Sequence, residues 1–136
     1  ALDEALKMMR EEGLDNIFFR HNKHKLAMSN AVKALNLKLF ADEKYLSPSI
    51  TAVKTEGIDA EEFRKTIKNN FDILLAGGQD HMKGKIFRVG HLGYVNDRDI
   101  ITVVSAISNT LVSLGKITAQ QAGEALVVTS RYLKEN

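Results

Sequence analysis

The sequence contains no cysteine and no tryptophan, and only one of its 136 residues is proline. The lack of cysteine excludes disulfide bonds, thiolate nucleophiles and cysteine-ligated metal sites, including a self-contained iron–sulfur or nickel–cysteine centre. It also fits a reducing compartment, so we expect a cytoplasmic protein. No apolar run approaches the ~20 residues that span a bilayer. The acidic, amphipathic first residues are unlike a signal peptide, and we expect no membrane partner.

Strong charge of either sign is also missing. The formal net charge is +2, and the basic residues form no run. The sequence therefore predicts no nucleic-acid partner, because such partners are bound by concentrated basic surfaces. The apolar share of 44% and the charged share of 26% are those of a folded globular chain. The length is sufficient for one domain with its own hydrophobic core.

Hydrophobic periodicity predicts two helices at the start of the chain. The first ends at Gly13, and the second begins at Asp15 and runs to about Asn36. The apolar stripe of the second helix comprises Leu14, Ile17, Phe18, Met28, Ala31, Val32 and Leu35. Phe19 and Leu26 lie on the other side, either as tolerated exposed residues or as contacts to an absent part of the protein. The chain starts without methionine and within a helical pattern, as expected either of a fragment of a larger protein or of a small protein that has been processed.

The rest of the chain alternates short strands with helices. We predict strands at residues 37–40, 50–56, 72–76 and 86–90, the third of them ended by the double glycine at 77–78. Helices with capping boxes are predicted to begin at Asp59, Asn96 and Thr118. Their expected buried faces contain Phe63, Ile67 and Phe71, and then Ile100, Val103, Val104, Ile107, Leu111 and Leu114. This order predicts an α+β fold in which helices cover one face of a small antiparallel sheet.

Arg88 is the first candidate for a binding residue. In the predicted strand, Phe87 and Val89 point to one face while Ile86 and Arg88 point to the other. A guanidinium among apolar neighbours needs water, a carboxylate or a phosphate, and its planar fork suits a carboxylate. An arginine on the solvent face of a one-sided sheet is the alternative, and the strand pattern by itself favours that role.

The histidines do not predict a metal site. His21 and His24 are one helical turn apart, but zinc needs three or four ligands and no further partner has a useful spacing. We interpret both as helix residues at a packed or wet boundary, and His81 and His91 as loop residues. The glycines lack phosphate-loop spacing, and no catalytic triad or carboxylate pair stands out. We therefore expect no catalytic, cofactor or metal site within this chain.

The segment FDILLAGGQDHMKGKIFRVGHLGYVNDRDI resembles the C-terminal small domain of class V pyridoxal-phosphate (PLP) aminotransferases, the alanine–glyoxylate and serine–glyoxylate group. The shared pattern is a strand before a double glycine, a polar loop, Gly-Lys, an apolar-Arg-apolar-Gly strand and a glycine turn before a helix. Upstream, SPSITAVKTEGIDAEEFRKTI resembles the preceding strand and helix, and MREEGLDNIFFRH resembles the helical connection from the large domain. The segment AGGQDHMKGKIFRVGHLG is most similar to the branch labelled as a soluble hydrogenase small subunit.

The resemblance implies a fold-type-I enzyme, normally a homodimer, that moves an amino group between an amino acid and a 2-oxo acid such as glyoxylate or pyruvate. It assigns residues 1–36 to a helical connection and residues 37–136 to the small domain. It matches Arg88 to the residue that binds the substrate α-carboxylate, and it places the PLP lysine outside this chain. The fragment alone is then expected to be inactive and to bind no PLP tightly.

Three alternatives stay open at this point. In the first, the chain is part of a non-catalytic subunit that associates with a soluble hydrogenase. In the second, it is a stand-alone small-ligand-binding module. In the third, it is part of a lyase related to the aminotransferases.

Overall fold

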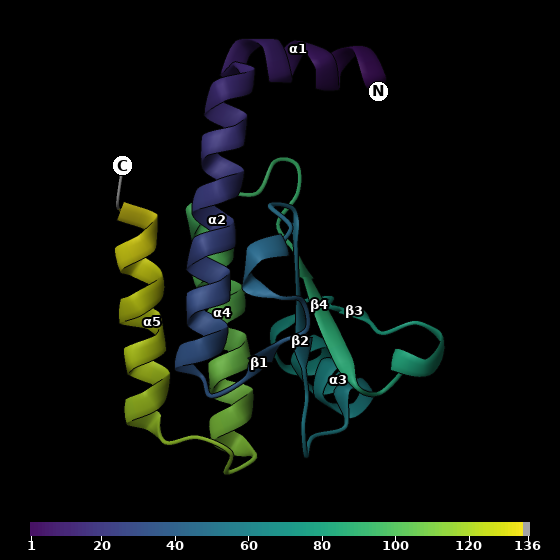
Figure 1. Ribbon diagram of the computed structural model, residues 1–136, viewed down its shortest axis with the longest axis vertical. Coiled ribbons are helices and arrows are strands. Elements are labelled where there is room, and N and C mark those ends of the chain that lie inside the picture. The colour runs from purple at the N-terminus through teal and green to yellow at the C-terminus, as the bar shows by residue number, and fades with distance from the viewer. Residues whose placement is uncertain (135–136) are drawn as a thin grey trace.

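The computed structural model describes residues 1–134, which form an α+β fold of helices packed on a four-stranded sheet (Figure 1). The helices are α1 (Leu2–Glu12), α2 (Leu14–Ala34), α3 (Ala60–Phe71), α4 (Asp97–Ser113) and α5 (Ala119–Lys134). The strands are β1 (Lys38–Leu39), β2 (Ile50–Lys54), β3 (Ala76–Gly77) and β4 (Ile86–Gly90), with the short 3₁₀ turns η1 (Glu43–Tyr45) and η2 (Asp80–Met82). The predicted fold class is confirmed. Within this range, none of the helices combines the length and apolar character that crossing a membrane requires.

The sheet has the order β1-β2-β4-β3, and every neighbouring pair is antiparallel. The strands β2 and β4 form its centre, while the edge strands β1 and β3 have two residues each. The strand predicted at 72–76 is wrong in its position. Asp72 ends α3 in the left-handed conformation (φ 55°, ψ 31°), and the next residues carry the chain back to the sheet. Pairing therefore starts only at Ala76, and Gly77 belongs to the strand that it was expected to end.

The core lies between the sheet and the helices. Phe87 of β4 is fully buried and its ring packs on Phe63 of α3, with 5.3 Å between the ring centroids. The second half of α2 is also in the core, and α5 packs beside α2 and α4 (Figure 1). Other core residues are Met28, Ala31, Val32, Val53, Ile67, Ile100, Val104, Ile107 and Leu111. Burial of these apolar side chains is the main favourable contribution to folding.

Four residues that we predicted to be buried are instead exposed. Phe71 is the last residue of α3, and Leu114 follows the last residue of α4, so both side chains lie at the margin of the core. Leu14 and Phe18 lie in the first turns of α2, which extend beyond the sheet together with α1 (Figure 1). Periodicity placed them on the correct helix face, but the core does not reach that end of the helix.

The helix starts follow local capping chemistry. The side chains of Asn96 and Asp99 form the predicted capping box of α4. Thr118 and Gln121 also bond reciprocally, at 2.9 and 3.2 Å. Asp59 accepts from the backbone N–H groups of the first turn of α3. The second helix differs from expectation, because it begins at Leu14 with Gly13, rather than Asp15, as its N-cap.

His91 connects the loop after β4 to the sheet through hydrogen bonds. Its side chain is fully buried, and its Nδ1–H donates to the Pro48 carbonyl at 3.0 Å. The Thr51 hydroxyl lies 2.9 Å from Nε2, and the backbone N–H of His91 donates to the Ser49 carbonyl at 2.9 Å. With Nδ1 as the donor, the neutral ring accepts the Thr51 hydroxyl proton at Nε2. Burial is the largest effect on this ring and lowers the pKa of His91 to about 4.

We predict that His91 makes stability pH-dependent. Its folded pKa lies below the ordinary value of 6.5, so the unfolded chain binds more protons between the two values. The contribution of the neutral ring is complete above the upper value and is lost as the pH falls toward the lower one. In urea titrations across this window, the unfolding free energy of the natural protein should fall more steeply than that of His91→Gln, by up to about 1.4 kcal/mol per pH unit. If the unfolding free energies of the two proteins changed with pH at the same slope, a lowered pKa of His91 in the folded state would be contradicted.

Candidate functional site

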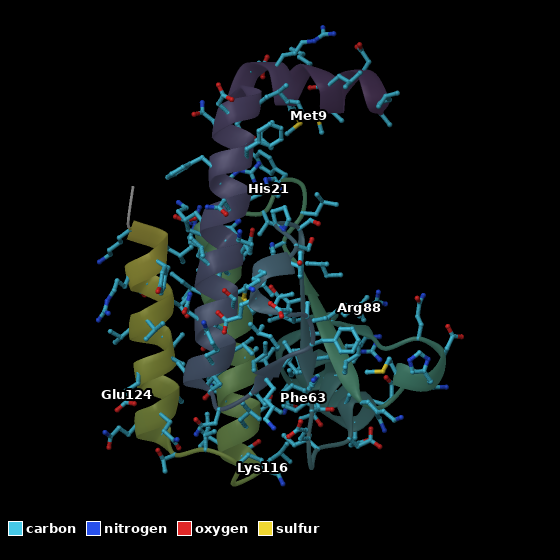
Figure 2. All side chains as sticks on the ribbon, viewed as in Figure 1. Met9, His21, Phe63, Arg88, Lys116 and Glu124 are labelled. Atoms are coloured by element: carbon cyan, nitrogen blue, oxygen red, sulfur yellow. The ribbon has the colours of Figure 1, made fainter. Side chains whose placement is uncertain are left out.

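Arg88 lies at the middle of β4, between the other strands of the sheet. Its Cα partners are Ala52 on β2 and Ala76 on β3. Phe87 and Val89 belong to the core, as the strand alternation predicted. Arg88 is half-buried on the other face, whereas Ile86 on that same face is buried beside the turn that follows Gly78. The outer face of this strand is thus partly covered. Figure 2 shows Arg88 at the sheet, well apart from α5.

The guanidinium of Arg88 is anchored at one nitrogen. Its Nε–H donates to the Gly77 carbonyl at 2.9 Å. Among residues 1–134, no carboxylate lies within ion-pair distance of Arg88, and neither terminal nitrogen has a hydrogen-bond partner. The two terminal nitrogens form the end of the fork that binds a carboxylate bidentately. The arrangement therefore leaves Arg88 oriented and able to bind an anionic group.

The helix histidines form hydrogen bonds with protein groups. His21 bonds the Ile17 carbonyl through Nδ1 at 2.7 Å, and its Nε2 accepts the Gly93 N–H at 3.3 Å. His24 is fully buried, and its Nε2–H donates to Asp97 at 2.9 Å. Burial outweighs this bond and lowers the pKa of His24. His81 is exposed in η2. In the part of the chain that the structure describes, no cluster of three or more acidic or histidine residues is placed to hold a metal ion.

Arg20 is a residue that the sequence analysis missed. It makes a bidentate ion pair with Glu12 at 2.6 and 2.9 Å, and this bonding lowers the pKa of Glu12. Its Nη1 also donates to the carbonyls of Gly93 and Val95 at 2.8 and 3.0 Å. Arg20 thereby joins α1, α2 and the loop after β4. Glu12 and Arg20 are eight residues apart across a helix break, a spacing that no single-helix pattern identifies.

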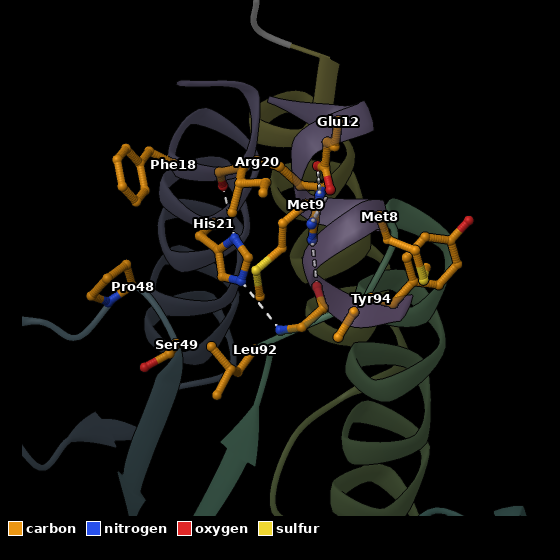
Figure 3. A pocket seen from close by; sticks show the side chains of 13 residues that line it. Met8, Met9, Glu12, Phe18, Arg20, His21, Pro48, Ser49, Leu92 and Tyr94 are labelled. Atoms are coloured by element: carbon orange, nitrogen blue, oxygen red, sulfur yellow. Dashed lines mark hydrogen bonds and ion pairs between the residues drawn. The ribbon is translucent and has the colours of Figure 1, made fainter. Parts of the chain in front are cut away.

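An apolar groove of about 640 Å³ opens between α1, the first turns of α2 and two loops (Figure 3). Its apolar lining includes Met8, Met9, Phe18, Leu92 and Tyr94, all of which are exposed. The wall that α1 supplies contains no buried residue. The charged residues of the groove, Glu12 and Arg20, pair with each other, and no lysine lines it. The groove therefore has the character of an interaction surface rather than of an anion site.

No protein-family model matches the chain. It is 51% identical over 133 residues to a soluble hydrogenase small subunit of Synechococcus sp. (strain PCC 6716), an alignment covering 98% of this chain and 34% of that protein. It is 33% identical to the serine–glyoxylate aminotransferase of Methylorubrum extorquens, over 99% of this chain and 34% of that protein.

Its structure resembles that of the pyridoxamine–pyruvate aminotransferase of Mesorhizobium loti with a TM-score of 0.90 and 26% identity, covering 97% of this chain and 34% of that one. The chain thus spans about a third of the length of the curated relatives that it matches. Both the sequence and the fold agree with the small domain that the resemblance implied. The homologues of this chain are thus class V aminotransferases and soluble hydrogenase small subunits, and the solved structure that it resembles is an aminotransferase matched over about a third of its length.

Proposed function

We propose that this chain is the substrate-binding small domain of a PLP-dependent aminotransferase that moves an amino group between an amino acid and a 2-oxo acid such as glyoxylate or pyruvate. In this proposal residues 1–36 connect it to a large domain, and residues 37–136 form the small domain. The observation that carries the proposal is the hydrogen bonding of the Arg88 side chain. Its guanidinium is held by the Gly77 carbonyl while its terminal nitrogens have no partner among the described residues.

Arg88 would bind the α-carboxylate of the substrate. Its planar fork matches the two carboxylate oxygens, and partial burial strengthens the attraction relative to water. Because Nε is already bonded, the side chain loses less conformational freedom when the ligand binds. A carboxylate held at a defined place also fixes the position of the neighbouring α carbon, which is how orientation contributes to rate.

The PLP site itself is proposed to lie outside this chain. PLP supplies an electron sink for the α carbon of an amino acid, and its enzymes hold it through a lysine. The groove offers neither a lysine nor an unpaired cation for a phosphate group. This chain alone is therefore proposed to be inactive. The full-length enzyme is proposed to be a cytoplasmic homodimer, with the absence of cysteine as support for the compartment.

We predict that Arg88→Lys in the full-length enzyme raises KM for the amino acid by about 10- to 100-fold and changes kcat much less. Lysine keeps the charge but loses the bidentate geometry, and charged hydrogen bonds contribute about 1.5–3 kcal/mol. Steady-state kinetics with varied amino acid checks this. Arg131→Lys on the exposed face of α5 is the matched control and should leave KM unchanged. An unchanged KM in Arg88→Lys would remove Arg88 from the site.

We further propose that the rest of the polypeptide covers the apolar groove. The chain spans about a third of its relatives, and the side chains that line the groove are exposed here. The α1 side of the groove contains no buried residue. Small-molecule sites are usually preformed pockets, so this exposed apolar surface is unfavourable for a small-molecule site. This argues against the stand-alone ligand-binding module.

A charged side chain introduced into the groove should therefore lower the unfolding free energy of the full-length protein more than that of the isolated chain. Leu92 is 69% exposed, so Leu92→Glu should change the unfolding free energy of this chain by at most about 0.5 kcal/mol. In the full-length protein the same change would bury a carboxylate and lower stability by more than about 1 kcal/mol. Val127→Glu on α5, at a similarly exposed position of 62%, is the control. Equal effects of Leu92→Glu in both proteins would rule out a covered groove.

A non-catalytic hydrogenase subunit is the second candidate, because the relative with 51% identity is named a soluble hydrogenase small subunit. The two functions differ in what the full-length protein does without partners. We expect the purified full-length protein to show the absorbance of bound PLP and to consume glyoxylate when an amino acid is supplied. A protein with neither property would support the subunit and overturn the enzyme.

A further inference from the structure

A Cβ at each residue of the double glycine would meet different neighbouring atoms. A Cβ on Gly77 would lie 2.5 Å from Arg64 Nη1 and 2.8 Å from Glu61 Oε1. A Cβ on Gly78 would lie 2.1 Å from the Met82 carbonyl oxygen, so Gly78 serves the turn that follows. Neither glycine has a positive φ. A side chain at position 77 would therefore meet the ends of two flexible side chains and displace the Arg64–Glu61 pair, and what fills this space is an arginine side chain of α3.

Arg64 holds the edge strand from the side of α3. Its Nε–H donates to the Leu75 carbonyl at 2.7 Å. Its Nη1 donates to both carboxylate oxygens of Glu61, at 2.9 and 2.8 Å, and only 22% of the side chain is exposed. Arg64 is therefore fixed at one end by its own helix and bonded at the other to the residue that precedes β3.

The strand β3 has few other contacts that fix its position. It pairs with β4 at only two positions, Ala76 with Arg88 and Gly77 with Phe87. The next ladder bond runs from the Gly78 N–H to the Ile86 carbonyl at 3.2 Å. Because so short an edge strand has few pairing bonds, the bond from Arg64 to the Leu75 carbonyl is a further constraint on the backbone that leads to the Gly77 carbonyl.

The same carbonyl orients Arg88. Arg88 Nε donates to Gly77 at 2.9 Å, so the guanidinium plane follows the edge strand. A continuous set of contacts thus runs from Glu61 through Arg64, the 75–77 backbone and finally Arg88. The links between side chains and backbone are hydrogen bonds or an ion pair, and residues 75 to 77 are joined by the covalent backbone.

We propose that Arg64 and Gly77 are positioning residues for carboxylate binding. Arg64 holds the edge strand through the Leu75 carbonyl, and the Gly77 carbonyl turns the terminal nitrogens of Arg88 toward the substrate. This inference rests on the proposed role of Arg88. Glycine at position 77 lets the Arg64 side chain pack directly against the backbone that carries the orienting carbonyl.

The test compares Arg64→Ala, Gly77→Ala and Arg88→Lys in the full-length enzyme. Arg64→Ala and Gly77→Ala should each raise KM for the amino acid, and Kd for pyruvate measured by calorimetry, by about 3- to 10-fold, the range of one net hydrogen bond. The value of kcat at saturation should stay unchanged. Lys65→Ala is the matched control, since Lys65 neighbours Arg64 on α3 but is 68% exposed and forms an ion pair with Glu62. It should change neither constant.

A merely structural role would give a different result. Loss of folded protein lowers kcat per milligram without changing KM or Kd, and that pattern in Arg64→Ala would overturn the proposal. If Gly77→Ala fails to fold, Arg64→Ala decides alone, because it removes atoms and creates no clash. In the Arg88→Lys background, Arg64→Ala should add little to KM, since residues that act through one group are not additive. Full additivity would also contradict the proposal.

The same series separates the two levels of inference. An unchanged KM in Arg88→Lys would remove the binding role itself. A raised KM in Arg88→Lys with unchanged values in Arg64→Ala and Gly77→Ala would remove only the positioning role.

Discussion

The hydrogen bond from Arg88 Nε to the Gly77 carbonyl connects the central strand of the sheet with its short outer edge. Arg88 is placed by β4, whose other face is anchored in the core by Phe87 and Val89. Gly77 is placed by a strand of two residues that relies on Arg64 of α3. A half-buried guanidinium needs bonding partners, and here one of its nitrogens bonds a backbone carbonyl while the other two have no carboxylate partner among residues 1–134. The sheet thus fixes the orientation of the Arg88 guanidinium.

A second set of polar contacts organises the other end of β4. His91 bonds the loop to β2, His21 bonds Gly93, and His24 bonds Asp97 at the start of α4. Arg20 adds two loop carbonyls and Glu12 of α1. Each of these buried or half-buried groups needs a partner, so together they define one loop conformation. The apolar groove lies over this loop, and its shape depends on the same contacts.

Much of the fold could be predicted from the sequence because its signals are local. The period of the apolar residues identified the helices, and Asn96 with Asp99 marked the start of α4 through contacts only three residues apart. The errors occur where distant segments meet. Phe71 and Leu114 fit the helical period but lie beyond the end of the core, and β3 begins later than its apolar run because α3 must first be closed. For the site, strand alternation placed Arg88 correctly but could not reveal its partner, eleven residues away across the sheet.

The sequence by itself determined the fold class, the absence of cysteine chemistry and the motif that resembles the class V aminotransferases. These follow from composition, local periodicity and the order of residues along the chain. Only the tertiary structure decided which side chains meet: that Arg64 occupies the space beside Gly77, that Arg20 joins two helices and a loop, and that three histidines bond protein groups. Such contacts depend on how the helices pack against the sheet. The periodicity of the sequence shows which face of an element is buried, but it does not show which distant side chains that face meets.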